Sequence, residues 1–162
     1  MRNPCVRGSP ATTTLRETSS AVETEAAGEQ LGRRLRQGDL VLLKGELGAG
    51  KTTFVRGMAR GSGSTAPVVS PTFQLVRVYP GRLPLAHVDL YRLEKGDHLS
   101  DLGLEELLDQ GAVVVEWGER LSSPLVGRSG EAGVGRFEFA LISIEHLGGD
   151  RRRLRVERDL KH

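Results

Sequence analysis

Apolar residues along the chain form short unbroken runs and helix-spaced sets, and these two patterns predict strands and helices. The clearest run covers residues 39–43, Asp-Leu-Val-Leu-Leu, and is typical of a strand that is buried on both faces of a parallel sheet. A capping-box pattern, Ser20 followed three residues later by Glu23, predicts a helix that begins there. We expect this helix to run to about Gln37, because Gly38 is a favourable residue for a helix end.

The remaining elements are shorter. The patterns predict strands over residues 12–18, 73–79, 85–90, 112–116, 137–144 and 154–156, and helices over 52–60 and 102–110. A Gly-Gly-Asp turn at 148–150 joins the last two strands in a C-terminal hairpin. Strands that alternate with helices early in the chain, followed by a late hairpin, predict an α/β fold. We expect a small, mainly parallel sheet flanked by helices, with antiparallel additions.

Composition narrows the class of protein without indicating a function. A chain of 162 residues suits one domain, expected over residues 12–162, and residues 1–11 are expected to be a disordered extension. The net charge of +2 permits contact with nucleic acid without requiring it. Cys5 is the single cysteine, and no apolar run approaches the roughly 20 residues that cross a bilayer. We therefore expect a cytoplasmic protein without an internal disulfide or a membrane contact.

A glycine-rich segment directly after the first strand matches the phosphate-binding P-loop, G-x-x-x-x-G-K-T, in full. Its residues are Gly45, Glu46, Leu47, Gly48, Ala49, Gly50, Lys51 and Thr52. Glycines let the backbone curl so that several N–H groups face a phosphate, and the following helix adds its positive end. We expect Lys51 to neutralise the terminal phosphates of ATP and the Thr52 hydroxyl to bind Mg²⁺. The fold is therefore expected to be P-loop NTPase-like.

Two acidic residues end predicted strands and are candidates for the second acid that a P-loop site needs. Asp89 ends the segment 85–89, and Glu116 ends the segment 112–116. The second segment is the more apolar and is expected to be the more central, so we favour Glu116 as the acid on the metal side. Asp89 is then expected to position or activate the attacking water. The division of roles stays open, because a carboxylate after a strand also serves as a helix cap or a solvated strand end.

Four residues near these segments have two interpretations each. Ser70 and Thr72 lie where a switch loop reaches the γ-phosphate, although Ser-Pro-Thr is also a favourable turn. Trp117 follows Glu116 and is either a packing residue or part of the site. For His87, core packing or a hydrogen bond is the favoured interpretation.

Four separated blocks together resemble one family of P-loop proteins, the TsaE (YjeE) family of bacterial tRNA threonylcarbamoyladenosine biosynthesis. The blocks are 45–54 (GELGAGKTTF), 70–73 (SPTF), 87–92 (HVDLYR) and 115–118 (VEWG). The resemblance implies an ATP-binding and ATP-hydrolysing protein that is required for this tRNA modification, with ATP and Mg²⁺ as cofactors. It also implies that the protein acts with a transferase heterodimer of two sugar-kinase-like proteins and contacts tRNA indirectly or weakly.

The resemblance gives the candidate residues their roles. It implies a phosphate role for Lys51, a metal role for Thr52 and Glu116, and a role in hydrolysis for Asp89. The further nucleotide-binding residues that it implies are Thr53, Ser20, Ala21, Thr72 and Trp117. The basic run 151–153, Arg-Arg-Arg, has no family motif behind it. Of its two interpretations, contact with tRNA phosphates and a solvated hairpin edge that discourages strand pairing, we favour the second.

Three other functions also use a P-loop. A GTPase reads its base with an Asn-Lys-x-Asp segment, and Asn3 is the single asparagine in the chain, which excludes that reader. A small kinase that acts on a metabolite needs a lid over the phosphates, and no convincing lid is found. A non-hydrolysing, ATP-sensing scaffold stays open. No arginine finger is evident in the motifs, so we expect slow turnover alone and faster turnover with the partner complex.

Overall fold

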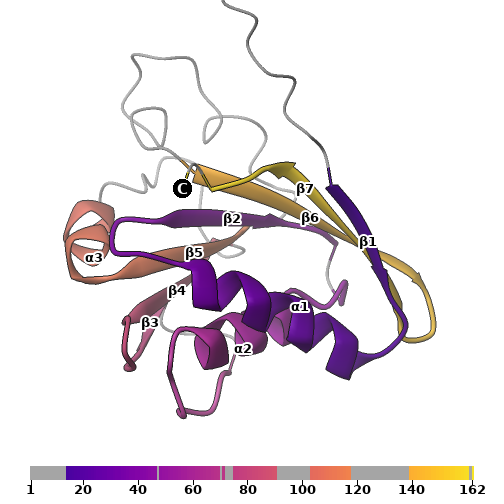
Figure 1. Cartoon of the computed structure of the whole chain (residues 1–162), viewed down its shortest axis with the longest axis horizontal. Helices are drawn as coiled ribbons and strands as arrows, with labels where there is room; N and C mark the ends of the chain where they lie inside the picture. Colours follow the sequence, from indigo (N-terminus) through magenta and orange to yellow (C-terminus); the bar gives the residue numbers. More distant parts are fainter. Residues whose placement is uncertain are drawn as a thin grey trace, which may run out of the picture.

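Seven strands form a single sheet in the computed structural model, which describes residues 14–46, 48–69, 71, 75–90, 103–117, 139–160 and 162 (Figure 1). The strands are β1 (Thr14–Thr18), β2 (Leu40–Lys44), β3 (Val76–Tyr79), β4 (Leu85–Asp89), β5 (Ala112–Trp117), β6 (Phe139–Gly148) and β7 (Arg151–Arg158). The helices are α1 (Ala21–Arg34), α2 (Lys51–Gly61) and α3 (Leu104–Gln110). None of the described helices is long and apolar enough to cross a membrane.

The sheet has a parallel centre and antiparallel margins. Its strand order is β1-β7-β6-β2-β5-β4-β3. The strand β2 pairs in parallel with both β5 and β6, and β4 pairs in parallel with β5. The remaining neighbours, β1 with β7, β7 with β6 and β3 with β4, are antiparallel. This arrangement confirms the predicted α/β class, the parallel core and the C-terminal hairpin.

The apolar run of β2 is buried on both faces because helices cover both sides of the sheet. Val41 and Leu43 belong to a core shared with α1 and α2, whose ribbons lie side by side below the sheet in Figure 1. Leu40 and Leu42 alternate to the opposite face, where they pack in a second core with α3. All four side chains are fully buried. Because side chains alternate between the two faces of a strand, the unbroken apolar run contributes to both cores.

The first helix begins where the sequence predicts and ends earlier. The Glu23 amide donates to Ser20 Oγ at 3.1 Å, and the Glu23 carboxylate accepts from the Ser19 amide at 2.6 Å, which gives the expected cap. The predicted end near Gln37 is wrong, because α1 ends at Arg34 and Leu35 takes an extended conformation. The Asp39 carboxylate accepts from the Arg36 amide at 2.7 Å and the Asp39 amide donates to the Arg36 carbonyl at 3.1 Å, so a turn follows Leu35 in place of further helix.

Glycines allow α1 and α2 to pack with their backbones in close approach. Each helix carries two glycines four residues apart, which are Gly28 and Gly32 in α1 and Gly57 and Gly61 in α2. A Cβ atom on Gly57 would overlap the carbonyl oxygen of Glu25, and a Cβ atom on Gly28 would overlap that of Phe54. The contact is reciprocal, since glycines on each helix face the backbone of the other. This face holds α2, and with it the P-loop, against α1.

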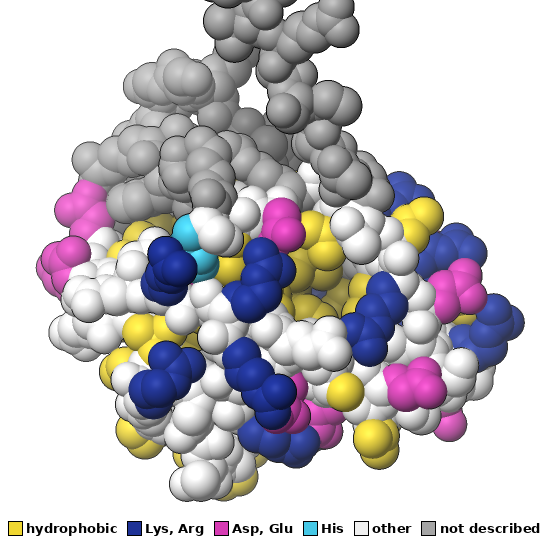
Figure 2. Space-filling model, viewed as in Figure 1, with side chains coloured by type: hydrophobic (Ala, Val, Ile, Leu, Met, Phe, Trp, Pro, Cys, Tyr) yellow, Lys and Arg dark blue, Asp and Glu magenta, His cyan; other side chains and the backbone are white. Residues whose placement is uncertain are grey.

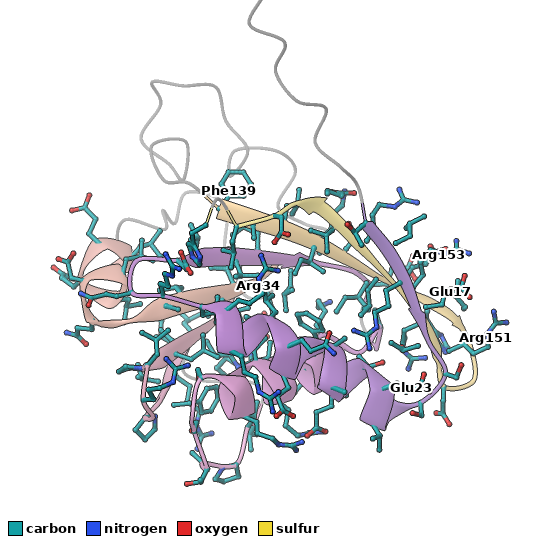
Figure 3. All side chains as sticks on the ribbon, in the orientation of Figure 1. Glu17, Glu23, Arg34, Phe139, Arg151 and Arg153 are labelled. Atoms are coloured by element: carbon teal, nitrogen blue, oxygen red, sulfur yellow. The ribbon has the colours of Figure 1, made fainter. Side chains whose placement is uncertain are left out.

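The arginine run 151–153 belongs to β7, which is not an edge strand of the sheet. The expectation of a hairpin edge is wrong, because β1 adds outside β7 and pairs with it along residues 14–18. Arg151 and Arg153 form ion pairs with Glu17 of β1 at 3.4 Å and 3.2 Å (Figure 3). Arg153 also reaches Glu145 of β6 at 3.5 Å. These two arginines therefore join three neighbouring strands on one face of the sheet.

The extension predicted over residues 1–11 lies outside the described residues. So do residues 73 and 74, at the start of the strand predicted over 73–79.

Candidate functional site

The carboxyl ends of three parallel strands meet beside the glycine-rich loop. Glu116 of β5 is in register with Leu43 of β2 on one side and with Asp89 of β4 on the other. The loop begins one residue after β2 ends at Lys44. Ligand sites of open parallel sheets lie at this edge, outside the carboxyl ends of the strands. The two acids that the sequence singled out are thus neighbours, and Glu116 is on the strand next to the loop.

The glycine-rich loop has the backbone that its sequence predicts. Gly48 and Gly50 have φ angles of +78° and +99°, a region that residues with a side chain rarely adopt. Gly50 is the N-terminal cap of α2, which begins at Lys51 and points its positive end at the loop. The Ala49 amide donates to the Glu46 carbonyl at 3.0 Å and closes the turn. Leu47 lies outside the described residues.

The Lys51 side chain folds back over the loop. Its ammonium group donates to the carbonyl oxygens of Gly45 at 2.5 Å and of Glu46 at 3.1 Å. Both acceptors are neutral carbonyl groups. The positive charge is therefore held at the mouth of the loop, where an anion can replace these contacts.

Thr52 and Glu116 bring two oxygen groups together at the start of α2. The Thr52 hydroxyl donates to Oε1 of Glu116 at 3.4 Å, and Glu116 is 5% exposed. Hydroxyl and carboxylate oxygens are the hard ligands that Mg²⁺ prefers, so the residues present fit that ion. Glu116 lies within β5, which extends by one residue, Trp117, beyond the strand end that the sequence predicts at Glu116. The Trp117 side chain lies outside the described part.

His87 lies behind Glu116 and is fully buried. Its Nε2 is 2.8 Å from Oε1 of Glu116, and its Nδ1 is 3.0 Å from the Tyr79 hydroxyl. That hydroxyl donates to the Val69 carbonyl at 3.0 Å. Burial raises the pKa of Tyr79 above its usual value, so the hydroxyl keeps its proton at neutral pH. The hydrogen-bond interpretation of His87 is thus the correct one.

Arg152 lies beside the glycine-rich loop, a position that sequence reasoning missed. Its guanidinium Nε would lie 3.2 Å from a Cβ atom on Gly50. A depression of about 30 Å³ beside the loop is lined by Ala21, Thr24, Gly50, Thr53, Asp150 and Arg152. Ala21 and Thr53, two of the expected nucleotide-binding residues, thus line one depression, and Arg152 lines it as well. Strand alternation was the missed signal, since the middle arginine of 151–153 must face away from its neighbours.

Some expected site residues do not take part in this geometry or cannot be placed. The Ser20 hydroxyl serves as the helix cap described above. Ser70 and Thr72 lie outside the described residues, although Val69 and Pro71 beside them are described. In the described part of the chain, no group of three or more His, Cys, Asp or Glu side chains has the arrangement of a metal cluster. A P-loop metal site does not need one, because phosphate oxygens complete it.

A larger cavity of about 250 Å³ lies between α1 and the margin formed by β1, β6 and β7. Its floor is apolar, with Ala27, Leu31 and Phe54 among its lining, and Arg16 and Arg34 lie at its rim. Figure 2 shows this hollow, with hydrophobic side chains inside and Lys or Arg side chains around it. None of its lining residues belongs to the P-loop or to the pair of acids.

A strand that leads into a G-x-x-x-x-G-K-T loop and a helix, in a sheet with a parallel core and an acid on the adjacent strand, defines a P-loop NTPase-like protein. Comparison with known proteins gives the particular family. The sequence model of the threonylcarbamoyl adenosine biosynthesis protein TsaE matches residues 18–148, and the chain belongs to this family.

Relatives in several bacteria support this assignment. The chain is 47% identical to the tRNA threonylcarbamoyladenosine biosynthesis protein TsaE of Treponema pallidum over 107 residues. These residues make up 65% of this chain and 79% of the relative. It is 43% identical over 135 residues to the TsaE of Streptomyces coelicolor, covering 81% and 76%. The crystal structure of YdiB from Bacillus subtilis superposes with a TM-score of 0.67 at 31% identity, covering 90% of this chain and 84% of that one.

Proposed function

We propose that this protein binds ATP with Mg²⁺ and hydrolyses it to support the threonylcarbamoyladenosine modification of tRNA, together with a transferase heterodimer of two sugar-kinase-like proteins. The observation that carries the ATPase part is the contact between Thr52 and Glu116 at the start of the P-loop helix. Membership of the TsaE family carries the pathway. The proposed location is the cytoplasm, where tRNA is modified.

The proposed roles follow the positions of the side chains. Backbone N–H groups of the loop and the Lys51 ammonium bind the phosphates, because both are positive groups held at the mouth of the loop. Thr52 and Glu116 hold Mg²⁺, which supplies charge neutralisation at the phosphate oxygens. Asp89, one strand farther from the loop, orients the attacking water. The order β2-β5-β4 favours this division over the reverse, because β5 adjoins the loop strand.

The rest of the nucleotide extends toward the start of α1. Ala21, Thr53 and Arg152 line the depression beside Gly50, together with Asp150. A guanidinium group at this place provides charge-assisted hydrogen bonds to the nucleotide. The tRNA contact is proposed to be indirect, since Arg151 and Arg153 are already paired with carboxylates.

The decisive experiment reconstitutes the tRNA modification with the partner heterodimer and compares wild type with Lys51→Ala over many turnovers. We expect wild type to release ADP and phosphate slowly alone and faster with the partners, and Lys51→Ala to support neither turnover nor repeated modification. Turnover that is the same with and without the heterodimer would contradict the proposed partnership. Phosphate transferred to a metabolite would indicate a kinase, and binding without any hydrolysis would indicate a sensing scaffold.

A further inference from the structure

A fully buried histidine stands directly behind the proposed metal-side acid, and no role in binding or hydrolysis has yet been given to it. The His87 side chain has both ring nitrogens within hydrogen-bond distance of a polar partner, Glu116 on one side and Tyr79 on the other. Burying a polar ring is unfavourable unless it is bonded in this way. The arrangement therefore needs a reason beyond filling space, which a leucine at this position would do as well.

The sheet itself lines up these three side chains. His87 of β4 is opposite Val114 of β5, and Glu116 follows Val114 by two residues, so its side chain is on the same face. Tyr79 of β3 is opposite Leu85 of β4, two residues before His87, and shares that face as well. The three side chains cross three adjacent strands on the face of the sheet that shares its core with α1 and α2. The row ends at Thr52, the first threonine of the P-loop helix.

The direction of the hydrogen bond between His87 and Glu116 shows that the histidine holds the carboxylate. An ionised carboxylate only accepts hydrogen bonds, so with Glu116 ionised, as metal binding requires, His87 Nε2–H is the donor at 2.8 Å. The longer Thr52 bond at 3.4 Å reaches the same oxygen, Oε1. On its other side the ring meets the Tyr79 hydroxyl, which lies 3.0 Å from His87 Nδ1 and 3.0 Å from the Val69 carbonyl, so its single proton serves one of these two acceptors at a time.

We propose that His87 is a positioning residue for the metal-side acid: its Nε2–H fixes Oε1 of Glu116 so that the carboxylate keeps one orientation toward Thr52. The Tyr79 hydroxyl contacts the other ring nitrogen and holds the ring of His87 in turn. This role rests on the proposed function, since it requires that Mg²⁺ binds with nucleotide at Thr52 and Glu116. It adds a residue that touches neither the metal nor the nucleotide and acts through the carboxylate.

Hydrogen-bond partners of metal-binding carboxylates typically contribute 10–100-fold to metal affinity. The readout is therefore the Mg²⁺ enhancement of ADP binding, which is the ratio of the dissociation constants measured by calorimetry in EDTA and in Mg²⁺. For His87→Asn, whose amide is too short to reach Glu116, we expect this enhancement to fall by about tenfold. The affinity for ADP without Mg²⁺ should stay within about twofold of wild type, because the phosphate contacts are untouched.

A conservative variant separates positioning from packing. His87→Gln places an amide N–H about where Nε2 lies and is expected to restore most of the Mg²⁺ enhancement. Tyr79→Phe keeps the aromatic ring and removes the hydroxyl, so we expect a smaller loss of about threefold. It also provides the test if His87→Asn does not fold. The matched control is His146→Gln, which changes an exposed histidine of the β6–β7 hairpin and should leave the ratio at the wild-type value.

Two results would overturn the role of His87. One is a wild-type Mg²⁺ enhancement in both folded His87→Asn and Tyr79→Phe, and the other is an equal loss in His87→Asn and His87→Gln. Failure of the proposed function would look different, because wild type itself would then show no enhancement of ADP binding by Mg²⁺.

Discussion

At the scale of single residues, neighbours along β7 have opposite tasks because a strand alternates its side chains. Arg151 and Arg153 point toward Glu17 and hold β1 to the sheet (Figure 3). Arg152 points to the other face and lies beside Gly50 of the P-loop. In the described part of the chain its guanidinium bonds are made to the backbone carbonyls of Gly149 and Arg151. Its charge is not neutralised by these carbonyls, which leaves it available to an anionic ligand.

The arginine pair provides a matched test. We expect Arg152→Ala to weaken ATP binding about tenfold, which corresponds to about 1.4 kcal/mol and to the lower end of a hydrogen bond to a charged group. Arg151→Ala removes the same charge one residue away and breaks a surface ion pair, so ATP affinity should stay within about twofold. Calorimetric titration of both variants checks this. Equal losses in the two variants would show that net charge, and not the position of Arg152, governs binding.

At the scale of secondary structure, the contact between α1 and α2 fixes where the P-loop helix begins. Glycine ordinarily destabilises a helix by about 1 kcal/mol relative to alanine, yet α2 keeps Gly57 and Gly61 where it meets α1. Close backbone approach explains this, because a Cβ atom on either residue would overlap a carbonyl oxygen of α1. The two glycines therefore lower the helix propensity of α2 and allow it to pack closely against α1. Lys51 and Thr52, on the first turn of α2, depend on that packing for their place beside the loop.

The direction in which Gly57→Ala changes the stability of the protein tests this interface. Gly57→Ala raises helix propensity, but overpacking against α1 is expected to lower the free energy of unfolding by about 2–3 kcal/mol. For a chain of this length, that lowers Tm by roughly 5–10 °C. Val22→Ala, at a position of α1 that is 77% exposed, should leave Tm nearly unchanged. Thermal melting followed by circular dichroism gives both values. A Tm of Gly57→Ala at or above that of wild type would refute the close approach.

At the scale of the whole molecule, the order of the strands assembles the site. The loop strand β2 lies at the centre, with β5 and β4 on one side and the β6–β7 hairpin on the other. The first side supplies Glu116 and Asp89, and the second supplies Arg152. The glycine-rich loop therefore lies between the strands of the two acids and the strand of Arg152. A nucleotide that bridges these parts stabilises the folded state as a whole, because the unfolded chain cannot bring them together.

This coupling is measurable as a thermal shift. With ATP and Mg²⁺ at 100 times the dissociation constant, we expect a stabilisation of about 2.7 kcal/mol and a rise in Tm of roughly 5–10 °C. Lys51→Ala should lose most of the shift at the same ligand concentrations, because its loop no longer neutralises the phosphates. The same shift in wild type and Lys51→Ala would mean that ATP binds away from the P-loop.

The sequence by itself determined the features that depend on local pattern. Periodicity placed every described strand and helix within a few residues of its bounds, and the eight-residue motif predicted the loop, since a P-loop is made by consecutive residues. The strand ends also indicated Asp89 and Glu116, because acids after apolar strands gather at one edge of a parallel sheet.

Only the tertiary structure decided which distant residues touch. His87 and Glu116 are 29 positions apart, and Arg152 reaches Gly50 from the far end of the chain. The strand β7 lies inside the sheet because β1 pairs along its outer side. These contacts depend on strand order and backbone approach, which arise only when the whole sheet forms. The local pattern therefore specified the elements, and their packing specified the neighbours of the site.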